Sequence, residues 1–183
     1  ANQPSVLAGV LDCDSSDKAG RFIRFCDAFN IPVLTLTNVS GFAASKYDEM
    51  HLAKAAAKLT CAFANATVPK VNVIMDKAFG TPYLAMNSKS VGADMVYAWP
   101  QARIGTMDPM MAAKIMYAGE ELAVIRERAA EYSGLQESAK SSAGRGYVDT
   151  IIEAADTRKY VIGAFEMLFT KREDRPAKKH GTV

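Results

Sequence analysis

The sequence has few of the residue types that build metal sites and nucleophilic triads. It holds only two histidines, His51 and His180, so a zinc site or a Ser-His-Asp arrangement has too few ligands and bases to draw on. The three cysteines, Cys13, Cys26 and Cys61, are odd in number and show no C-x-x-C spacing. We therefore expect reduced thiols, no metal in this domain and a cytoplasmic location.

Common phosphate-binding and membrane-spanning patterns are also missing. Neither G-x-G-x-x-G nor G-x-x-x-x-G-K-[ST] occurs, and there is no G-x-S-x-G elbow, which argues against dinucleotide, ATP and triad-hydrolase sites. A charged residue interrupts every apolar run before the roughly 18 residues that a membrane span needs. Because the chain opens with Ala1 and has no basic and apolar leader, we expect a piece of a longer protein without a signal peptide.

The charge is small and uneven. The chain has 22 Lys and Arg against 20 Asp and Glu, a net charge of +2. Within residues 171–183 two acidic residues stand against five basic ones, Lys171, Arg172, Arg175, Lys178 and Lys179. A nearly neutral body with a short basic tail is a poor match for nucleic acid. We expect the tail to be solvated or to pack on a neighbouring subunit, with an acidic partner as the alternative.

The pattern of the remaining chain predicts one α/β domain. Its 183 residues are 49% hydrophobic and 23% charged, an ordinary composition for a single folded domain. Strands are predicted at 6–11, 31–39, 71–75, 94–99, 102–107 and 146–152. Helices are predicted from a cap at Ser15 or Ser16 to residue 30, and at 47–66, 84–86, 109–117, 120–132 and 157–169, with a Ser- and Gly-rich loop at 138–146. This alternation indicates a largely parallel sheet with right-handed crossovers.

The turn at Gly80 is the feature that points to chemistry. It joins a predicted strand to a predicted helix, with Pro82 in the first helical turn. Backbone N–H groups at the start of a helix can stabilise a developing oxyanion. Taken alone, a glycine in such a place is more often only a tight turn.

Seven short segments stand in the order found in one family. They are Ala1–Pro4, Arg24–Pro32, Gly41–Phe42, Ala66–Lys70, Lys77–Gly80, Tyr97–Pro100 and Arg145–Asp149. In these segments the chain resembles the C-terminal half of the carboxyltransferase β subunits of biotin-dependent acyl-CoA carboxylases and decarboxylases, such as propionyl-CoA carboxylase. The resemblance implies a crotonase-like β-β-α superhelix, with residues 1–183 as one carboxyltransferase C-terminal domain and 171–183 as its basic tail.

The resemblance also implies a site and partners. In the family this half holds carboxybiotin, and an N-terminal half holds the acyl-CoA substrate. Partners would be that N-terminal half, the biotin carboxyl carrier protein and biotin carboxylase or decarboxylase subunits, in a dimer or hexamer. Backbone N–H groups stabilise the biotin oxyanion, a role that maps onto Gly80 and Thr81. Biotin binding maps onto Gly41, Phe42, Phe79 and Tyr83.

Two segments depart from the family pattern. The family usually has Gly-Gly-Ala-Tyr where this chain has Gly80-Thr81-Pro82-Tyr83, and proline has no N–H to donate. The family's Met-Gly-(Ala or Pro)-(Glu or Lys)-Gly-Ala is Met107–Ala112 here, without its two glycines. Either the Thr81 N–H works alone, helped by its hydroxyl or by water, or this site no longer stabilises the biotin anion.

Several functions remain open on this basis. The chain could serve a carboxylase acting on propionyl-CoA or another short acyl-CoA, or a decarboxylase of methylmalonyl-CoA or glutaconyl-CoA. It could also be a non-catalytic carboxyltransferase-like assembly domain. An independent crotonase-like hydrolase or isomerase is disfavoured, because no complete acyl-CoA site is visible. We expect self-association through helices 47–66 and 108–132. We also expect Gly41, Phe42, Gly80, Thr81 and Tyr83 to surround one pocket.

Overall fold

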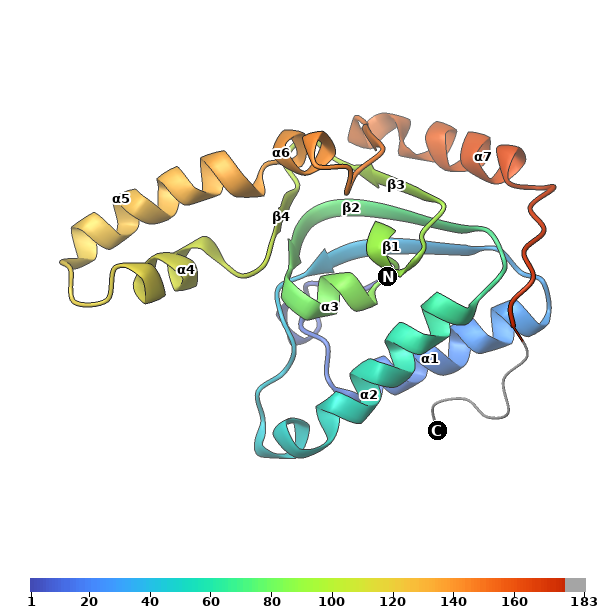
Figure 1. The fold of residues 1–183 in the computed structure, drawn as a ribbon, viewed down its shortest axis with the longest axis horizontal. Coiled ribbons are helices and arrows are strands. Elements are labelled where there is room, and N and C mark those ends of the chain that lie inside the picture. The colour runs from blue at the N-terminus through green and yellow to red at the C-terminus, as the bar shows by residue number, and fades with distance from the viewer. Residues whose placement is uncertain (177–183) are drawn as a thin grey trace.

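A parallel sheet forms the centre of the molecule in the computed structural model, which describes residues 1–176 (Figure 1). Strands β1 (Val33–Val39), β2 (Lys70–Phe79), β3 (Met95–Ala98) and β5 (Thr150–Ile151) lie in the order β1-β2-β3-β5. The short β4 (Arg103–Gly105) pairs with the end of β2. Every strand pair is parallel, as the alternation of strands and helices predicted.

Helices cover both faces of this sheet. Helices α1 (Cys13–Ala28) and α2 (Lys46–Asn65) pack together on one face, and α7 (Thr157–Met167) lies on the other. Helix α3 (Gly80–Ala85) follows β2 directly. Helices α4 (Pro109–Met116) and α5 (Leu122–Tyr132) form an arm that points away from the sheet, and a π-helical turn at Ser133–Glu137 joins α5 to α6 (Ala139–Gly144) (Figure 1).

Strand β2 is buried on both sides, because alternate side chains enter opposite cores. Ile74 belongs to the large cluster that includes Leu59 and Phe63 of α2. Val71 and Val73 belong to a second cluster, which includes Ala164 of α7. The apolar run predicted as the third strand is therefore the central strand of the domain.

The predicted strand at 6–11 was wrong. Leu7–Gly9 form a 3-10 turn with positive φ at all three residues, and only Leu11 makes a bridge, to Phe42. The side chain of Asn2 holds this turn by donating to the carbonyl oxygens of Gly9 and Asn38 and accepting from the Asn38 N–H. A contact from outside the apolar run thus overrides its strand propensity.

Two helix starts also differ from prediction. Helix α1 is capped by Asp12 and not by Ser15 or Ser16. The Asp12 carboxylate accepts from the Ser15 N–H at 2.8 Å, and the Ser15 hydroxyl accepts from the Asp12 N–H. The segment predicted as a loop at 138–146 contains α6, because Ser138 caps it by accepting from the Ser141 N–H. Small residues predicted a loop, yet their hydroxyls can also start helices.

Helix α2 packs against α1 and α3, and part of its surface stays exposed. Leu59 and Phe63 are buried, while Met50 is 74% exposed. Cys13 and Cys26 are buried, Cys61 is half-buried and all three are free, as predicted. Among residues 1–176, no helix is both long and apolar enough to cross a membrane.

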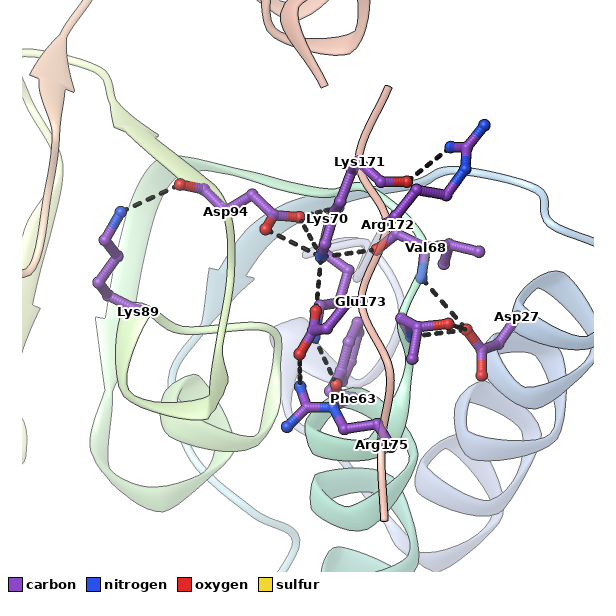
Figure 2. Close-up of polar contacts among 11 residues, drawn as sticks. Asp27, Phe63, Val68, Lys70, Lys89, Asp94, Lys171, Arg172, Glu173 and Arg175 are labelled. Atoms are coloured by element: carbon purple, nitrogen blue, oxygen red, sulfur yellow. Dashed lines mark hydrogen bonds and ion pairs between the residues drawn. The ribbon is translucent and has the colours of Figure 1, made fainter. Parts of the chain in front are cut away.

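The start of the basic tail packs on the domain itself, which corrects the expectation of a solvated or partner-bound segment at Lys171. The Lys171 ammonium pairs with Asp94 at 2.9 Å and with Glu173 at 3.1 Å, and it donates to the Val68 carbonyl (Figure 2). Beneath it, the fully buried Lys70 donates to the Phe63 carbonyl at 2.8 Å. Lys178 and Lys179 lie outside the described residues.

Candidate functional site

The Gly80 turn requires glycine for two reasons. Its φ is +67°, in the left-handed region that side chains disfavour. A Cβ atom at this position would also lie 3.2 Å from the Thr106 carbonyl oxygen. Thr106 is the first residue after β4, and Gly105 of β4 pairs with Phe79 of β2. Packing of β4 against the end of β2 therefore fixes the path of the turn.

The start of α3 offers backbone N–H groups as possible donors. The first N–H groups of a helix have no acceptor within it, and α3 has no side-chain cap. Thr81 is an exposed residue that lines the neighbouring cavity, so its N–H is the candidate donor to an external acceptor. Pro82 is buried in the next position and has no N–H. The geometry thus supports an oxyanion site with a donor at Thr81 and none at Pro82.

A cavity of about 580 Å³ opens beside this turn. Its walls come from α3, from β4 and the loop after it, and from the segment that runs from the end of α5 past α6. The lining residues most relevant to chemistry are Gly80, Thr81, Tyr83, Thr106, Tyr132, Gln136, Ser142, Arg145 and Tyr147. The volume falls within the range of small-molecule sites, roughly 300 to 1,000 Å³.

Tyr83 is a neutral hydrogen-bonding group in this cavity. Burial, and to a lesser degree the nearby Tyr147, raises the pKa of Tyr83 to about 12. The phenol therefore keeps its proton at physiological pH and can donate a hydrogen bond. It is not poised to act as a base.

The structure brings together only part of the predicted set. Gly80, Thr81 and Tyr83 line the cavity, and Phe79 lies buried directly before the turn. Gly41 and Phe42 do not line it. They follow the end of β1, where the Gly41 carbonyl accepts from the Leu11 N–H and Phe42 packs on the large core. Both groups lie near the carboxyl ends of neighbouring parallel strands, because Val39 pairs with Ala78.

Residues from 132 to 147 were missed as part of this site. Arg145 and Tyr147 stand in a segment that resembles the family, so the sequence held a signal for them. Gln136 and Ser142 gave no such signal, because Gln136 lay between predicted elements and Ser142 lay in the predicted loop at 138–146. Only the packing of the π-helical turn and of α6 beside β4 brings them to the Gly80 turn.

A buried carboxyl group supports the wall of the cavity. Glu137 is fully buried; its Oε2 accepts from the Ser133 hydroxyl at 3.2 Å, and its Oε1 has no hydrogen-bond partner. Burial raises the pKa of Glu137. Gly105 is in contact with it, since a Cβ there would lie 3.1 Å from the Glu137 Cγ.

Outside this cavity, we looked for a reactive thiol and for groups of metal ligands. Burial, followed by the carboxylate of Asp48, raises the pKa of Cys13 to about 11, so this thiol stays protonated. Within residues 1–176 no three His, Cys, Asp or Glu side chains are grouped as ligands for a metal ion.

Comparison with known proteins identifies the family. The carboxyl transferase domain model matches residues 1–183. The putative propionyl-CoA carboxylase beta chain of Bacillus subtilis is 48% identical over 100% of this chain and 38% of its own length. The methylmalonyl-CoA decarboxylase subunit alpha of Veillonella parvula is 46% identical over 100% of this chain and 36% of its own length.

A solved structure supports the same assignment. Transcarboxylase 12S, described as a hexamer with methylmalonyl-coenzyme A and methylmalonic acid bound, superposes with a TM-score of 0.95 at 45% identity. The match covers 98% of this chain and 36% of that one. It confirms the predicted crotonase-like fold. The chain spans a little over a third of the length of the curated relatives it matches, and it belongs to the carboxyl transferase domain family.

Proposed function

We propose that residues 1–183 are the biotin-side domain of an acyl-CoA carboxyltransferase, which moves a carboxyl group between carboxybiotin and a short-chain acyl-CoA such as propionyl-CoA. The observation that carries the proposal is the Gly80 turn, since Gly80 and Thr81 line a cavity of ligand size. The names of the relatives support the reaction class.

The residues of this chain can accommodate a ureido group, but they offer one N–H donor where the family pattern has two. Biotin carried on a partner would supply the group that accepts and releases the carboxyl. Thr81 would stabilise negative charge on the ureido oxygen through its N–H, and Tyr83 offers a neutral hydroxyl nearby. The role predicted for Gly41 and Phe42 stays a prediction, since they do not line this cavity.

Pro82 sets the expected strength of this site. Losing one donor of an oxyanion hole costs about 3 to 4 kcal/mol. We therefore expect a correctly shaped cavity that binds free biotin weakly. The expected Kd is about 1 mM, which corresponds to a binding free energy of about −4 kcal/mol. Titration with biotin should shift the Thr81 amide resonance, and shifts confined to other amides would place the site elsewhere.

A Pro82→Ala variant tests the proposal in the complete assembly with its biotin carrier. It restores the missing N–H, so carboxyl transfer should rise at least about tenfold. Pro109→Ala is the matched control, because Pro109 lies in the first turn of α4, away from the cavity, whereas Pro82 lies between Thr81 and Tyr83, which line it. If neither wild type nor Pro82→Ala transfers a carboxyl group to or from any short acyl-CoA, the chain is a non-catalytic assembly domain.

The same assembly decides the direction of the reaction. Relatives named as carboxylases and as decarboxylases have similar identity to this chain, 48% and 46%. ATP-dependent carboxylation of propionyl-CoA would identify a carboxylase. Sodium-dependent loss of CO2 from methylmalonyl-CoA or glutaconyl-CoA would identify a decarboxylase.

We also propose that the working unit is an oligomer that includes an N-terminal carboxyltransferase half. Exposed apolar side chains on α2 and α4 support this, namely Met50, Met111 and Ile115, which are 74%, 60% and 66% exposed. Transcarboxylase 12S is described as a hexamer. Sedimentation at high micromolar concentration should show a dimer or hexamer, and a strict monomer would contradict the proposal.

A further inference from the structure

Arg145 brings a positive charge to the cavity beside the Gly80 turn. Among the described residues that line this cavity, it is the one Lys or Arg, and no Asp or Glu lines it. Its guanidinium donates from Nη2 to the Gln136 side-chain oxygen, a neutral acceptor that also lines the cavity. None of the ion pairs found within residues 1–176 involves Arg145.

Asp149 and Glu137 lie near Arg145 in the sequence, but neither lines the cavity. Both carboxylate oxygens of Asp149 accept from Lys89 at 2.8 Å, and one also accepts from the Val96 N–H. Glu137 is fully buried behind Gly105, and its side chain accepts from the Ser133 hydroxyl and does not line the cavity. Arg145 therefore lines the cavity with no carboxylate beside it among residues 1–176.

The other lining groups complete a site for an anion. Tyr83 is a neutral phenol, and the hydroxyls of Thr81 and Ser142 can donate hydrogen bonds. Arginine presents a planar fork of N–H donors that matches the two oxygens of a carboxylate. The positive charge of Arg145 also interacts favourably with the dipole at the C-terminal end of α6, which ends at Gly144. This stabilising role would not require the hydrogen bond to Gln136.

We propose that Arg145 binds the carboxylate that the enzyme transfers, and that Gln136 orients the guanidinium for it. This inference rests on the proposed carboxyltransferase function, and it adds a residue that recognises the cargo. The carboxylate is present on carboxybiotin before transfer and on the carboxylated acyl-CoA afterwards. The chemistry at Arg145 is the same in both cases, and an experiment distinguishes the two sources.

The test compares the binding of ligands that differ by one carboxylate, in the complete carboxyltransferase. The first pair is N-carboxybiotin methyl ester and biotin methyl ester, and the second is methylmalonyl-CoA and propionyl-CoA. Wild type should prefer the carboxylated member of at least one pair. Arg145→Gln should reduce that preference by about 10- to 100-fold, and Arg145→Lys by less, since it keeps the charge but loses the fork. Arg126→Gln, on the exposed side of α5 and outside the cavity, should leave it unchanged.

Each outcome has a defined meaning. Loss of preference in the biotin pair assigns Arg145 to carboxybiotin, and loss in the acyl-CoA pair assigns it to the acyl product. A change below twofold in both pairs would overturn the inference. If wild type transfers no carboxyl group, the proposed function fails, whereas the two binding pairs still decide the role of Arg145.

Folding of the variant is checked separately. Arg145 is exposed, so Arg145→Gln should melt at the wild-type temperature. If it does not, Gln136→Ala leaves the guanidinium in place without its orienting partner and should reduce the same preference by a smaller factor. An unchanged preference in that variant as well would count against the inference. Guanidinium ion added to Arg145→Ala should partly restore the preference, which a purely structural role would not allow.

Discussion

Replacing Gly80 by alanine should weaken both the fold and the site. The left-handed backbone at φ +67° costs a side chain about 1 to 2 kcal/mol. The new Cβ would also lie 3.2 Å from the Thr106 carbonyl, so that loop must move by a few tenths of an ångström. We expect a total loss of about 2 kcal/mol in the free energy of unfolding, which lowers the melting temperature of a chain of this size by about 4 to 8 °C.

Gly146→Ala is the matched control for stability. Gly146 also has a positive φ, +81°, but a Cβ there would meet nothing within 4 Å. Gly146→Ala therefore has the energetic cost of a side chain at positive φ but no steric contact. The difference between the two melting temperatures isolates the effect of the contact with Thr106. If Gly80→Ala melts no lower than Gly146→Ala, the packing of β4 does not fix the path of the Gly80 turn.

Carboxyl transfer by Gly80→Ala tests the same geometry at the chemical step. A donor displaced by a fraction of an ångström loses much of its effect on a developing oxyanion. Transfer should therefore fall at least about tenfold at a temperature where the variant is folded. Unchanged transfer by a destabilised variant would show that the Thr81 N–H does not serve the reaction.

Other predictions concern the carboxyl at Glu137, the helix α7 and the C-terminal contact of Lys171. Burial raises the pKa of Glu137, so its contribution to stability is present below about pH 4.3, the pKa of an unfolded glutamate, and is lost as the pH rises through the folded pKa. The free energy of unfolding of Glu137→Gln, measured with urea, should thus exceed that of wild type by about 1 to 3 kcal/mol at pH 8 and by little at pH 4. Equal gains at both pH values would contradict this. Gly163→Ala should raise the free energy of unfolding by about 0.5 to 1 kcal/mol, because a Cβ there meets nothing within 4 Å inside α7, and a lower melting temperature would refute it. Lys171→Met leaves Asp94 without its ammonium partner and should lower the free energy of unfolding by about 1 to 2 kcal/mol, and Lys171→Met with Asp94→Asn should recover part of that loss. A single variant as stable as wild type would show that the ion pair contributes nothing.

The sequence by itself determined the order and type of most elements. Local patterns are enough for this, because an apolar run such as 71–75 can satisfy its backbone only in a buried strand or helix, and glycine at 80 marks a turn. The helix at 47–66 was predicted within one residue at each end, since Ser45 caps it by accepting from the Asp48 N–H. The family resemblance then predicted that the Gly80 turn is part of a site.

Only the tertiary structure decided what surrounds that turn. Gln136, Ser142 and Arg145 reach the cavity because the π-helical turn and α6 pack beside β4, more than fifty residues after Gly80. No local pattern encodes such a contact, since it depends on how separate segments share one core. The same holds for the turn at Leu7–Gly9, which the side chain of Asn2 holds out of the sheet. The chain's local preferences set its elements, while the burial of distant surfaces against each other set the composition of its site.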